Sequence, residues 1–313
     1  MTSDAAPTAA EELFGRPPAD LPALDPAPPS RRHDPNLEIR ILDFTSKRDR
    51  KLFMDVGDGF YEGDPNYIAP LRIQQDKFLD PSKNPTYEHI EARPMIAYRD
   101  GKPVGRMSVQ IDRDFEVYND KKTGLFGFFE SIDDPTVAHT MLDDGLRWLK
   151  RRGCVEVLGP ANFNLTHPCG LVVKNFDRPP FVEELYNHPY YQALIESFGL
   201  AKAKDLYAWW LNIDEGMNHP KRERIERISQ RIVKKEGVTF REVDMKNVKK
   251  EIQVVHHLFT QAWEKNWGFN PIPAKEFEWI CEDIAAVAIP ELIVFMQIDG
   301  RDVGFVLTMP NIN

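Results

Sequence analysis

Two short segments of the chain alternate apolar and polar residues in the same way around a shared Asp-Gly pair. Residues 94–112 read PMIAYRDGKPVGRMSVQID, and residues 291–310 read ELIVFMQIDGRDVGFVLTMP. Gly101 returns as Gly300 and Gly105 as Gly304, each 199 positions later. Asp-Gly between two runs of strand-like alternation predicts a β-hairpin. The sequence therefore predicts the same hairpin at two places in the chain.

The segments that precede each hairpin also repeat. A strand is predicted for LEIRILDF (37–44) and again for VTFREVDM (238–245), because apolar residues recur at every second position. Helical periodicity follows both strands, most clearly over 248–269 and 274–288. A strand, helices and a hairpin that recur at a nearly constant offset indicate a tandem duplication.

After the first hairpin, the pattern predicts further elements that the second copy lacks. We expect a strand over 124–131, and over 154–162 a buried strand that runs into a loop. Between them a helix is expected over 134–153, which Pro135 starts and Gly153 ends. A second helix ends at Gly199, and a last strand is expected over 204–213. The predicted fold class is therefore α/β, or α+β with a mixed sheet.

These patterns divide the chain into four parts. We predict a disordered Pro/Ala-rich tail over 1–36, a first domain over 37–213, a basic helical linker over 214–236, and the N-terminal half of a second domain over 237–313. The second copy is expected to be incomplete at the C-terminus.

Composition narrows the functional class. The net charge of −9 argues against nucleic acid as a partner. The three cysteines lack metal-site or disulfide spacing, so we expect no metal and a reducing, cytoplasmic location. No apolar run has the length of a membrane span. The basic run 221–235 is typical of a solvated helix face or of peripheral contact with the inner membrane.

The order of elements resembles the GNAT N-acyltransferase fold, and two motifs carry the resemblance: the hairpin and NHPYYQALIESFGL (187–200). Longer stretches, such as FYEGDPNYIAPL, GPANFNLTHPCGLVVKNFDRPP and AWEKNWGF, are similar to bacterial proteins of the YghO and bacterial ceramide synthase type. The resemblance implies a tandem GNAT-like fold. It also implies transfer of a fatty acyl group from acyl-CoA, acetyl-CoA or a related thioester to a small-molecule or lipid amine such as a sphingoid base.

The first copy departs from the GNAT pattern in two places. The Gly-rich loop that holds the CoA diphosphate in this fold is replaced by ESIDDPTVAHT, whose acids suit helix capping. The cofactor-binding residues are therefore unknown, and in the second copy the usual loop would lie after Asn313. The tyrosine that serves many GNAT enzymes as an acid is replaced by Ile195.

Four residues are candidates for catalysis: His167, Tyr191, Tyr190 and Glu130. His167 has a side chain that titrates near neutrality, and either tyrosine lies one turn before the usual acid position. Glu130 lies at a strand end where a GNAT base can lie, although helix capping is a competing explanation. Cys169 is interpreted as a buried thiol rather than a nucleophile.

Polar and aromatic stretches supply the candidates for substrate binding. The polar ones either contact substrate or fix turns and helix ends, and the aromatic ones form either an acyl groove or core. The candidates are Asn162, Asn164, Thr166, Asn187, Tyr61, Trp263, Asn266, Trp267 and Phe269.

Three functions remain open at this point. The first is an N-acyltransferase of bacterial ceramide or sphingolipid synthesis, and a variant of it is an acetyltransferase of an unknown amine. The second is a non-catalytic acyl-binding or regulatory protein, which the missing diphosphate loop favours. The third is an aminoacyl transferase of the tandem-GNAT kind, which the acidic composition does not support.

Overall fold

The computed structural model describes residues 34–311 and 313. The predicted disordered tail, apart from residues 34–36, lies outside the described residues. The chain divides into two compact units, and each is described by itself. Unit 1 runs to Lys204 and includes residues 268–271 and 313, whereas unit 2 comprises residues 205–267 and 272–311. The domain boundaries expected at 213 and 236 stay a prediction.

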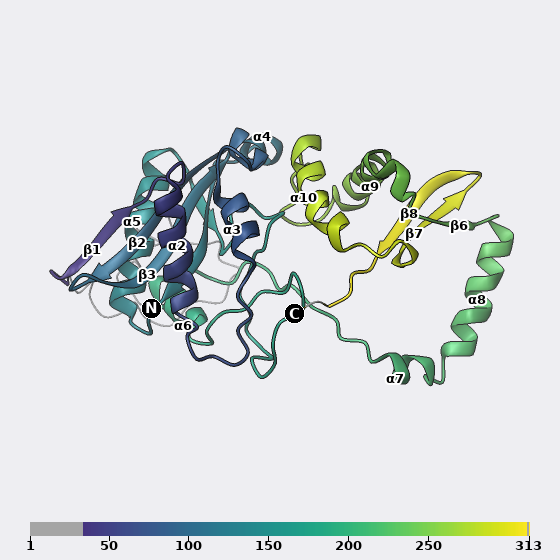
Figure 1. The fold of residues 1–313 in the computed structure, drawn as a ribbon, viewed down its shortest axis with the longest axis horizontal. Coiled ribbons are helices and arrows are strands. Elements are labelled where there is room, and N and C mark those ends of the chain that lie inside the picture. Colours follow the sequence, from purple (N-terminus) through teal and green to yellow (C-terminus); the bar gives the residue numbers. More distant parts are fainter. Residues whose placement is uncertain (1–33, 312) are drawn as a thin grey trace, which may run out of the picture. The chain divides into compact units, whose positions relative to one another are not determined.

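Unit 1 is built on a mixed sheet of five strands in the order β1-β2-β3-β4-β5 (Figure 1). The first four strands pair antiparallel, and β5 joins parallel to the start of β4. The strands are β1 (Leu37–Ile41), β2 (Ile90–Arg99), β3 (Lys102–Asp112), β4 (Thr123–Ser131) and β5 (Glu156–Leu158). The predicted mixed α/β class is confirmed.

Helices cover both faces of this sheet. On one face, Phe53 and Met54 of α2 (Lys47–Gly59) pack with Ile96 of β2, near α3 (Arg72–Leu79) and the 3₁₀ turn η1 (Pro85–Glu88). On the other face, α5 (Pro135–Arg151) and α6 (Tyr191–Phe198) bury their apolar side chains against Met95 and Met107. The short helix α4 (Arg113–Asn119) joins β3 to β4.

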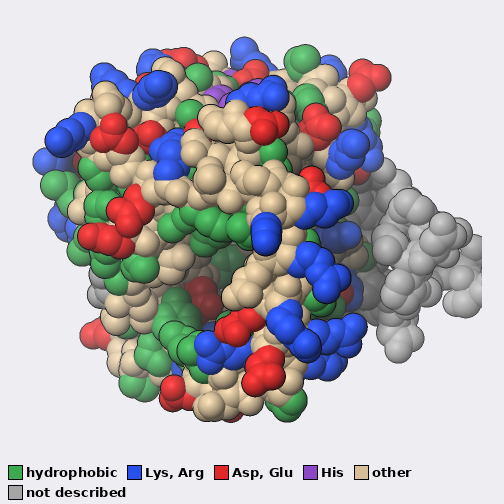
Figure 2. All heavy atoms as spheres, turned by 90° about the vertical axis from the view of Figure 1, so that its right-hand side faces the viewer, with side chains coloured by type: hydrophobic (Ala, Val, Ile, Leu, Met, Phe, Trp, Pro, Cys, Tyr) green, Lys and Arg blue, Asp and Glu red, His purple; other side chains and the backbone are tan. Residues whose placement is uncertain are grey.

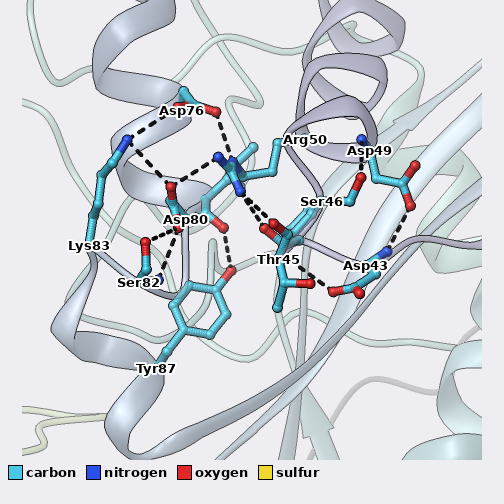
Figure 3. Close-up of polar contacts among 12 residues, drawn as sticks. Asp43, Thr45, Ser46, Asp49, Arg50, Asp76, Asp80, Ser82, Lys83 and Tyr87 are labelled. Carbon is cyan, nitrogen blue, oxygen red and sulfur yellow. Dashed lines mark hydrogen bonds and ion pairs between the residues drawn. The ribbon is translucent and has the colours of Figure 1, made fainter.

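A buried arginine ties α2 to its neighbours (Figure 3). Arg50, only 4% exposed, donates through Nε to Asp76 at 2.8 Å and lies 2.9 Å from Asp80 at the end of α3. Its Nη1 donates to the Phe44 carbonyl at 2.7 Å, in the turn between β1 and α2. Five N–H donors in a planar fork allow one side chain to hold three segments together. The start of α2 is thereby fixed to the end of α3 and to the turn after β1.

Unit 2 contains a three-stranded antiparallel sheet in the order β6-β7-β8. Its strands are β6 (Thr239–Glu242), β7 (Ile293–Ile298) and β8 (Arg301–Leu307). Its helices are α7 (Ile213–Met217), α8 (Arg222–Lys235), α9 (Val248–Trp263) and α10 (Ala274–Val287), with 3₁₀ turns η2 (Met245–Asn247) and η3 (Pro290–Leu292). None of the helices within residues 34–311 combines the length and hydrophobicity that crossing a membrane requires.

The two sheets repeat the predicted hairpin down to its register. Ala97 pairs with Gly105 and the pairing then shifts by one residue, just as Met296 pairs with Gly304 before the same shift. The Asp-Gly pair has positive φ at both positions in each copy, 52° and 75° in the first and 50° and 71° in the second. Two consecutive positive φ angles define the turn that matches strand twist. The predicted duplication of the hairpin is confirmed.

One predicted strand is wrong. Residues 204–212 form no strand, and Trp209 and Trp210 are 91% and 67% exposed. A strand needs a neighbouring edge with free N–H and C=O groups, and no described strand pairs with this segment. Within 154–162, which is predicted as a strand that runs into a loop, the strand covers only Glu156–Leu158, and the chain turns away at Gly159 and Pro160.

Candidate functional site

A buried carboxylate with two phenol donors lies in unit 1, near the end of β4. Glu130 Oε2 accepts hydrogen bonds from Tyr61 at 2.8 Å and from Tyr191 at 2.6 Å. On its other side, Glu130 Oε1 is 3.5 Å from Nη2 of Arg106, which faces it across the β3–β4 pair. We name Tyr61, Arg106, Glu130 and Tyr191 the Glu130 cluster. All four residues are less than 10% exposed.

An irregularity in β4 sets the direction of Glu130. Arg106 pairs with Glu130 but Ser108 already pairs with Gly127, so β4 carries an extra residue between them. Phe128 within this bulge has a φ of 51°, and its N–H donates to Asn162 Oδ1 at 2.8 Å. A β-bulge redirects the side chains that follow it, and such bulges are common beside active sites.

Glycine at position 57 makes room for the arginine. A Cβ atom at Gly57, inside α2, would lie 1.9 Å from Cζ of Arg106. The guanidinium instead lies over the Phe53 ring at 4.7 Å, and its Nη1 donates to the Phe53 carbonyl at 2.6 Å. Glycine weakens a helix, so its presence here is explained by the space that the buried charge needs.

Aromatic rings cover the cluster on the side of Tyr61. The Tyr61 ring stacks on Tyr67, with 4.2 Å between centroids, and on His188 at 4.6 Å. The outer rings are anchored in turn: Tyr67 donates to Asp58 at 2.8 Å, and His188 Nε2 lies 2.8 Å from the Phe60 carbonyl. We name Tyr61, Tyr67 and His188 the aromatic stack. Tyr67 and His188 are half-buried, so the stack leads from the partly exposed surface to Glu130.

The electrostatics of the cluster favour proton exchange. Burial raises the pKa of the Glu130 carboxyl, while the Arg106 guanidinium and the two phenol hydrogen bonds oppose that rise. Burial, with the charge of Glu130, raises the pKa of both Tyr61 and Tyr191 far above that of a free phenol. Both hydroxyls are therefore protonated donors near neutral pH. Glu130 is a stronger base than an exposed carboxylate, a property typical of groups that move protons in enzymes.

Comparison with known proteins places this chain in a family. No protein-family model matches the chain. It is 32% identical to protein YghO of Escherichia coli (strain K12) over 273 residues, which cover 87% of this chain and 68% of YghO. It is also 32% identical to the bacterial ceramide synthase of Caulobacter vibrioides (strain NA1000 / CB15N) over 282 residues, which cover 89% of this chain and 71% of the synthase. The chain belongs to the family of these two proteins.

Solved structures of low sequence identity also match. A tandem GNAT protein from the clavulanic acid biosynthesis pathway aligns over 88% of this chain and 75% of its own, with a TM-score of 0.45 and 12% identity. An aminoglycoside acetyltransferase from an uncultured soil metagenomic sample aligns over 57% of this chain and 97% of its own, with a TM-score of 0.37 and 12% identity.

Within this family member, the structure brings three predicted site residues together. Glu130, Tyr191 and Tyr61 form the core of the cluster. Tyr61 was predicted only as an aromatic residue of an acyl groove or of the core, and not as a partner of Glu130. Tyr190 lies beside them and donates to the Ser131 carbonyl at 2.9 Å, and burial raises its pKa to about 12. His167 is not in the cluster: it is buried elsewhere, 5.0 Å from the Phe78 ring. The catalytic roles of all these residues stay predictions.

The predicted polar binding residues hold loops in place. Asn164 Oδ1 accepts from the N–H of Thr166 at 3.0 Å and from its hydroxyl at 2.6 Å. Asn187 bonds both the N–H and the carbonyl of Val172, at 2.7 and 3.2 Å. Asn162 likewise accepts from the backbone of the β4 bulge. These contacts agree with the alternative that the asparagines fix turns. Contact between these residues and a substrate stays a prediction. Cys169 is only partly buried, and this burial raises the pKa of its thiol. Its interpretation as a buried thiol rather than a nucleophile stays a prediction.

The residues predicted around 263–269, whose aromatic members were expected to form an acyl groove or core, are divided between the two units. Trp263, Asn266 and Trp267 belong to unit 2, where the two tryptophans are 49% and 48% exposed. Phe269 is grouped with unit 1 and is buried, with its ring edge-on to Tyr118 at 5.8 Å. A shared acyl groove stays a prediction.

The start of α5 is closed to a diphosphate, as its sequence suggests. Asp134 caps the helix by accepting from the Thr136 N–H at 2.8 Å, and it also pairs with Arg99 at 2.9 Å. A helix N-terminus binds phosphate through free N–H groups and its positive end, and here a carboxylate already occupies that position.

Sequence reasoning missed Arg106, Tyr67 and His188 as parts of the site. A signal for Arg106 was present, because it follows Gly105 in a strand whose neighbours are nearly all apolar or small. Strand alternation alone treats such a charge as solvent-facing, whereas the bulge of β4 and Gly57 allow it to be buried.

Proposed function

We propose that the chain is an N-acyltransferase that moves a fatty acyl group from a thioester such as acyl-CoA to the amine of a sphingoid-base-like acceptor. The observation that carries this proposal is the buried Glu130 carboxylate, which accepts hydrogen bonds from the hydroxyls of Tyr61 and Tyr191. The named activity of one relative, the bacterial ceramide synthase, supports the substrate class.

The chemistry requires a proton acceptor. A long-chain amine arrives as an ammonium ion and must lose one proton before its nitrogen attacks the thioester carbonyl. In the proposed step, Tyr61 takes that proton as its own proton passes to Glu130. The new C–N bond forms, the C–S bond breaks, and the leaving thiolate takes that proton back from Glu130 through Tyr61. The nitrogen then loses its second proton to Glu130 by the same route, which leaves a neutral amide and a neutral thiol, and Glu130 releases this proton to water. Arg106 holds Glu130 in position and limits the rise of its pKa.

We propose that the acyl donor is a thioester, and we leave open whether it is acyl-CoA or an acyl carrier protein. The capped start of α5 argues against the usual diphosphate grip in unit 1. CoA and an acyl carrier protein present the same reacting thioester, so the proposal for Glu130 holds for either donor.

The test is a direct assay with purified protein, acyl-CoA of several chain lengths and sphinganine, with the amide product measured by mass spectrometry. Glu130→Gln is expected to lower kcat at least about 100-fold, because a positioned general base contributes that much or more. Glu91→Gln, an exposed residue of β2 that pairs with Arg152, is the matched control and should keep full activity. Amide formation that survives Glu130→Gln would overturn the assignment of the base.

A second candidate is an acyl-binding protein without catalysis, which the carboxylate at the start of α5 favours. Binding to the native state alone raises thermal stability without turnover. Acyl-CoA that raises the Tm of the wild-type chain while no amide forms with any acceptor would favour this candidate.

A further inference from the structure

An apolar stripe on α8 of unit 2 is exposed. Ile225, Ile228 and Ile232 recur at helical spacing and are 61%, 48% and 51% exposed. With Phe240 of β6 and Met296 of β7, they line an open groove of about 340 Å³. Phe240 is itself 59% exposed, so the groove offers apolar surface to solvent rather than a closed core. An apolar surface of this kind marks a site of interaction.

Basic residues border this stripe. The helix reads RERIERISQRIVKK, with six basic and two acidic residues, in a chain whose net charge is −9. Arg224, Arg227 and Arg231 are exposed, and the described part of the chain provides none of them with an ion-pair partner. Arg224 and Arg231 lie four residues before and three residues after Ile228, so they adjoin it on the helix surface. Figure 2 shows Lys and Arg side chains gathered on one part of this face of the molecule.

The segment that leads into this helix adds exposed aromatic rings. Tyr207, Trp209 and Trp210 are 76%, 91% and 67% exposed, and Leu211 is 76% exposed. Tryptophan and tyrosine are favoured at the boundary between lipid headgroups and acyl chains, where the apolar ring and its polar group are both accommodated. An amphipathic helix with an apolar stripe and a basic flank suits the same boundary.

We propose that residues 206–235 bind the surface of a lipid bilayer that contains anionic lipids. In this arrangement α8 lies in the interface, its isoleucines enter the headgroup boundary, and its unpaired arginines contact lipid phosphates. The charge of the helix decides among occupants. A symmetric pairing of α8 with α8 of a second copy would bring two basic flanks together, and a neutral bilayer would offer the arginines no net negative charge, whereas anionic lipids provide it. This binding is independent of the proposed acyl transfer.

The test uses the full chain in co-sedimentation with phosphatidylcholine vesicles, with and without phosphatidylglycerol. The protein should bind the vesicles with phosphatidylglycerol, and binding should weaken as salt is raised. The triple variant R224E/R227E/R231E is expected to lower the partition coefficient at least about tenfold, since each basic residue near an anionic surface strengthens binding. The matched control K47E/R48E/K102E makes the same charge change at exposed positions of unit 1 and should bind as the wild-type chain does.

Further outcomes decide the mode of binding. The variant I225S/I228S/I232S should also lose vesicle binding while it keeps the wild-type circular dichroism spectrum, because α8 has no buried residue. Equal binding to both kinds of vesicle, no binding, or an equal loss in the control would overturn the proposal. A stable dimer without lipid that the isoleucine variant dissociates would instead assign this face to a second copy.

Discussion

At the scale of single residues, Gly57, Arg106 and Glu130 depend on one another at the Glu130 cluster. Arg106 is buried because Gly57 leaves space for it, and Arg106 in turn faces Glu130 across two strands. Leaving one charge of a buried pair without the other is strongly unfavourable. The glycine, the arginine and the carboxylate therefore depend on one another, although they lie far apart in the sequence.

Gly57→Ala is expected to destabilise the protein by about 2 kcal/mol, because overpacking beside Arg106 outweighs the better helix propensity of alanine. Gly59→Ala is the matched control: it lies in the same helix, and a Cβ there meets no atom within 4 Å. That control should be neutral or slightly stabilising. Urea denaturation of both variants checks this, and equal effects would contradict the steric explanation.

Glu130 should also make stability depend on pH. Burial raises its pKa in the folded state above the ordinary 4.5, so the folded protein holds this proton more tightly than the unfolded chain. The stability it contributes is therefore complete below pH 4.5 and is lost as the pH rises through the raised pKa. Glu130→Gln cannot ionise. Its free energy of unfolding should therefore rise relative to that of the wild-type protein as the pH increases from 4.5 through the raised pKa of Glu130. A difference that does not change with pH would contradict this assignment.

At the scale of elements, Arg50 connects α2 with α3 and with the turn after β1 (Figure 3). This anchor fixes α2, and the chain that leaves α2 carries Tyr61 to Glu130. The first copy of the repeated unit thus holds its site through a buried charge network as well as through its apolar core.

Arg50→Ala should cost about 3 kcal/mol or more of unfolding free energy, because it leaves the buried carboxylate of Asp80 without its main partner. Lys51→Ala, on the same helix but in an exposed pair with Asp55, should cost less than about 0.5 kcal/mol. Thermal denaturation of the two variants provides the comparison. Similar losses for both would show that Arg50 contributes no more than a surface ion pair.

Among the described residues, the segment of residues 205–221 should be the first site of proteolysis. It contributes no strand to either sheet and contains the most exposed aromatic side chains of the described chain. Exposed backbone without sheet partners is cut preferentially. Limited trypsin digestion followed by mass spectrometry should yield, within residues 34–311, first cleavage after Lys204 or Lys221. Early cuts within β2 to β4 would contradict the structure.

The sequence predicted local features better than distant ones. The hairpins were predictable because Asp-Gly and strand alternation act over a few residues. Glu130, Tyr61 and Tyr191 were each singled out from their own stretch, but their meeting was not, since contacts across 69 and 61 positions depend on the β4 bulge and on the path after α2. The strand predicted over 204–213 was wrong because apolar content indicates burial without providing a partner edge.

At the scale of the whole molecule, the same hairpin unit occurs in two different settings. In the first copy, a second set of helices covers the sheet and the bulge of β4 presents Glu130. In the second copy, β6, β7 and β8 accompany a basic amphipathic helix whose apolar side is open. We therefore propose that the first copy carries out acyl transfer, and that the part of the chain around the second copy binds a lipid bilayer.

The central claim is that Glu130 supports acylation of a long-chain amine, and the lipid content of cells tests it most directly. The source organism without this gene would receive either the wild-type gene or the Glu130→Gln variant at equal protein level, and its lipids would be measured by mass spectrometry. The account predicts that the wild-type gene restores ceramide-type amides, while the variant leaves the free sphingoid amine to accumulate. An amide profile unchanged by loss of the gene, or restored equally by the variant, would contradict it.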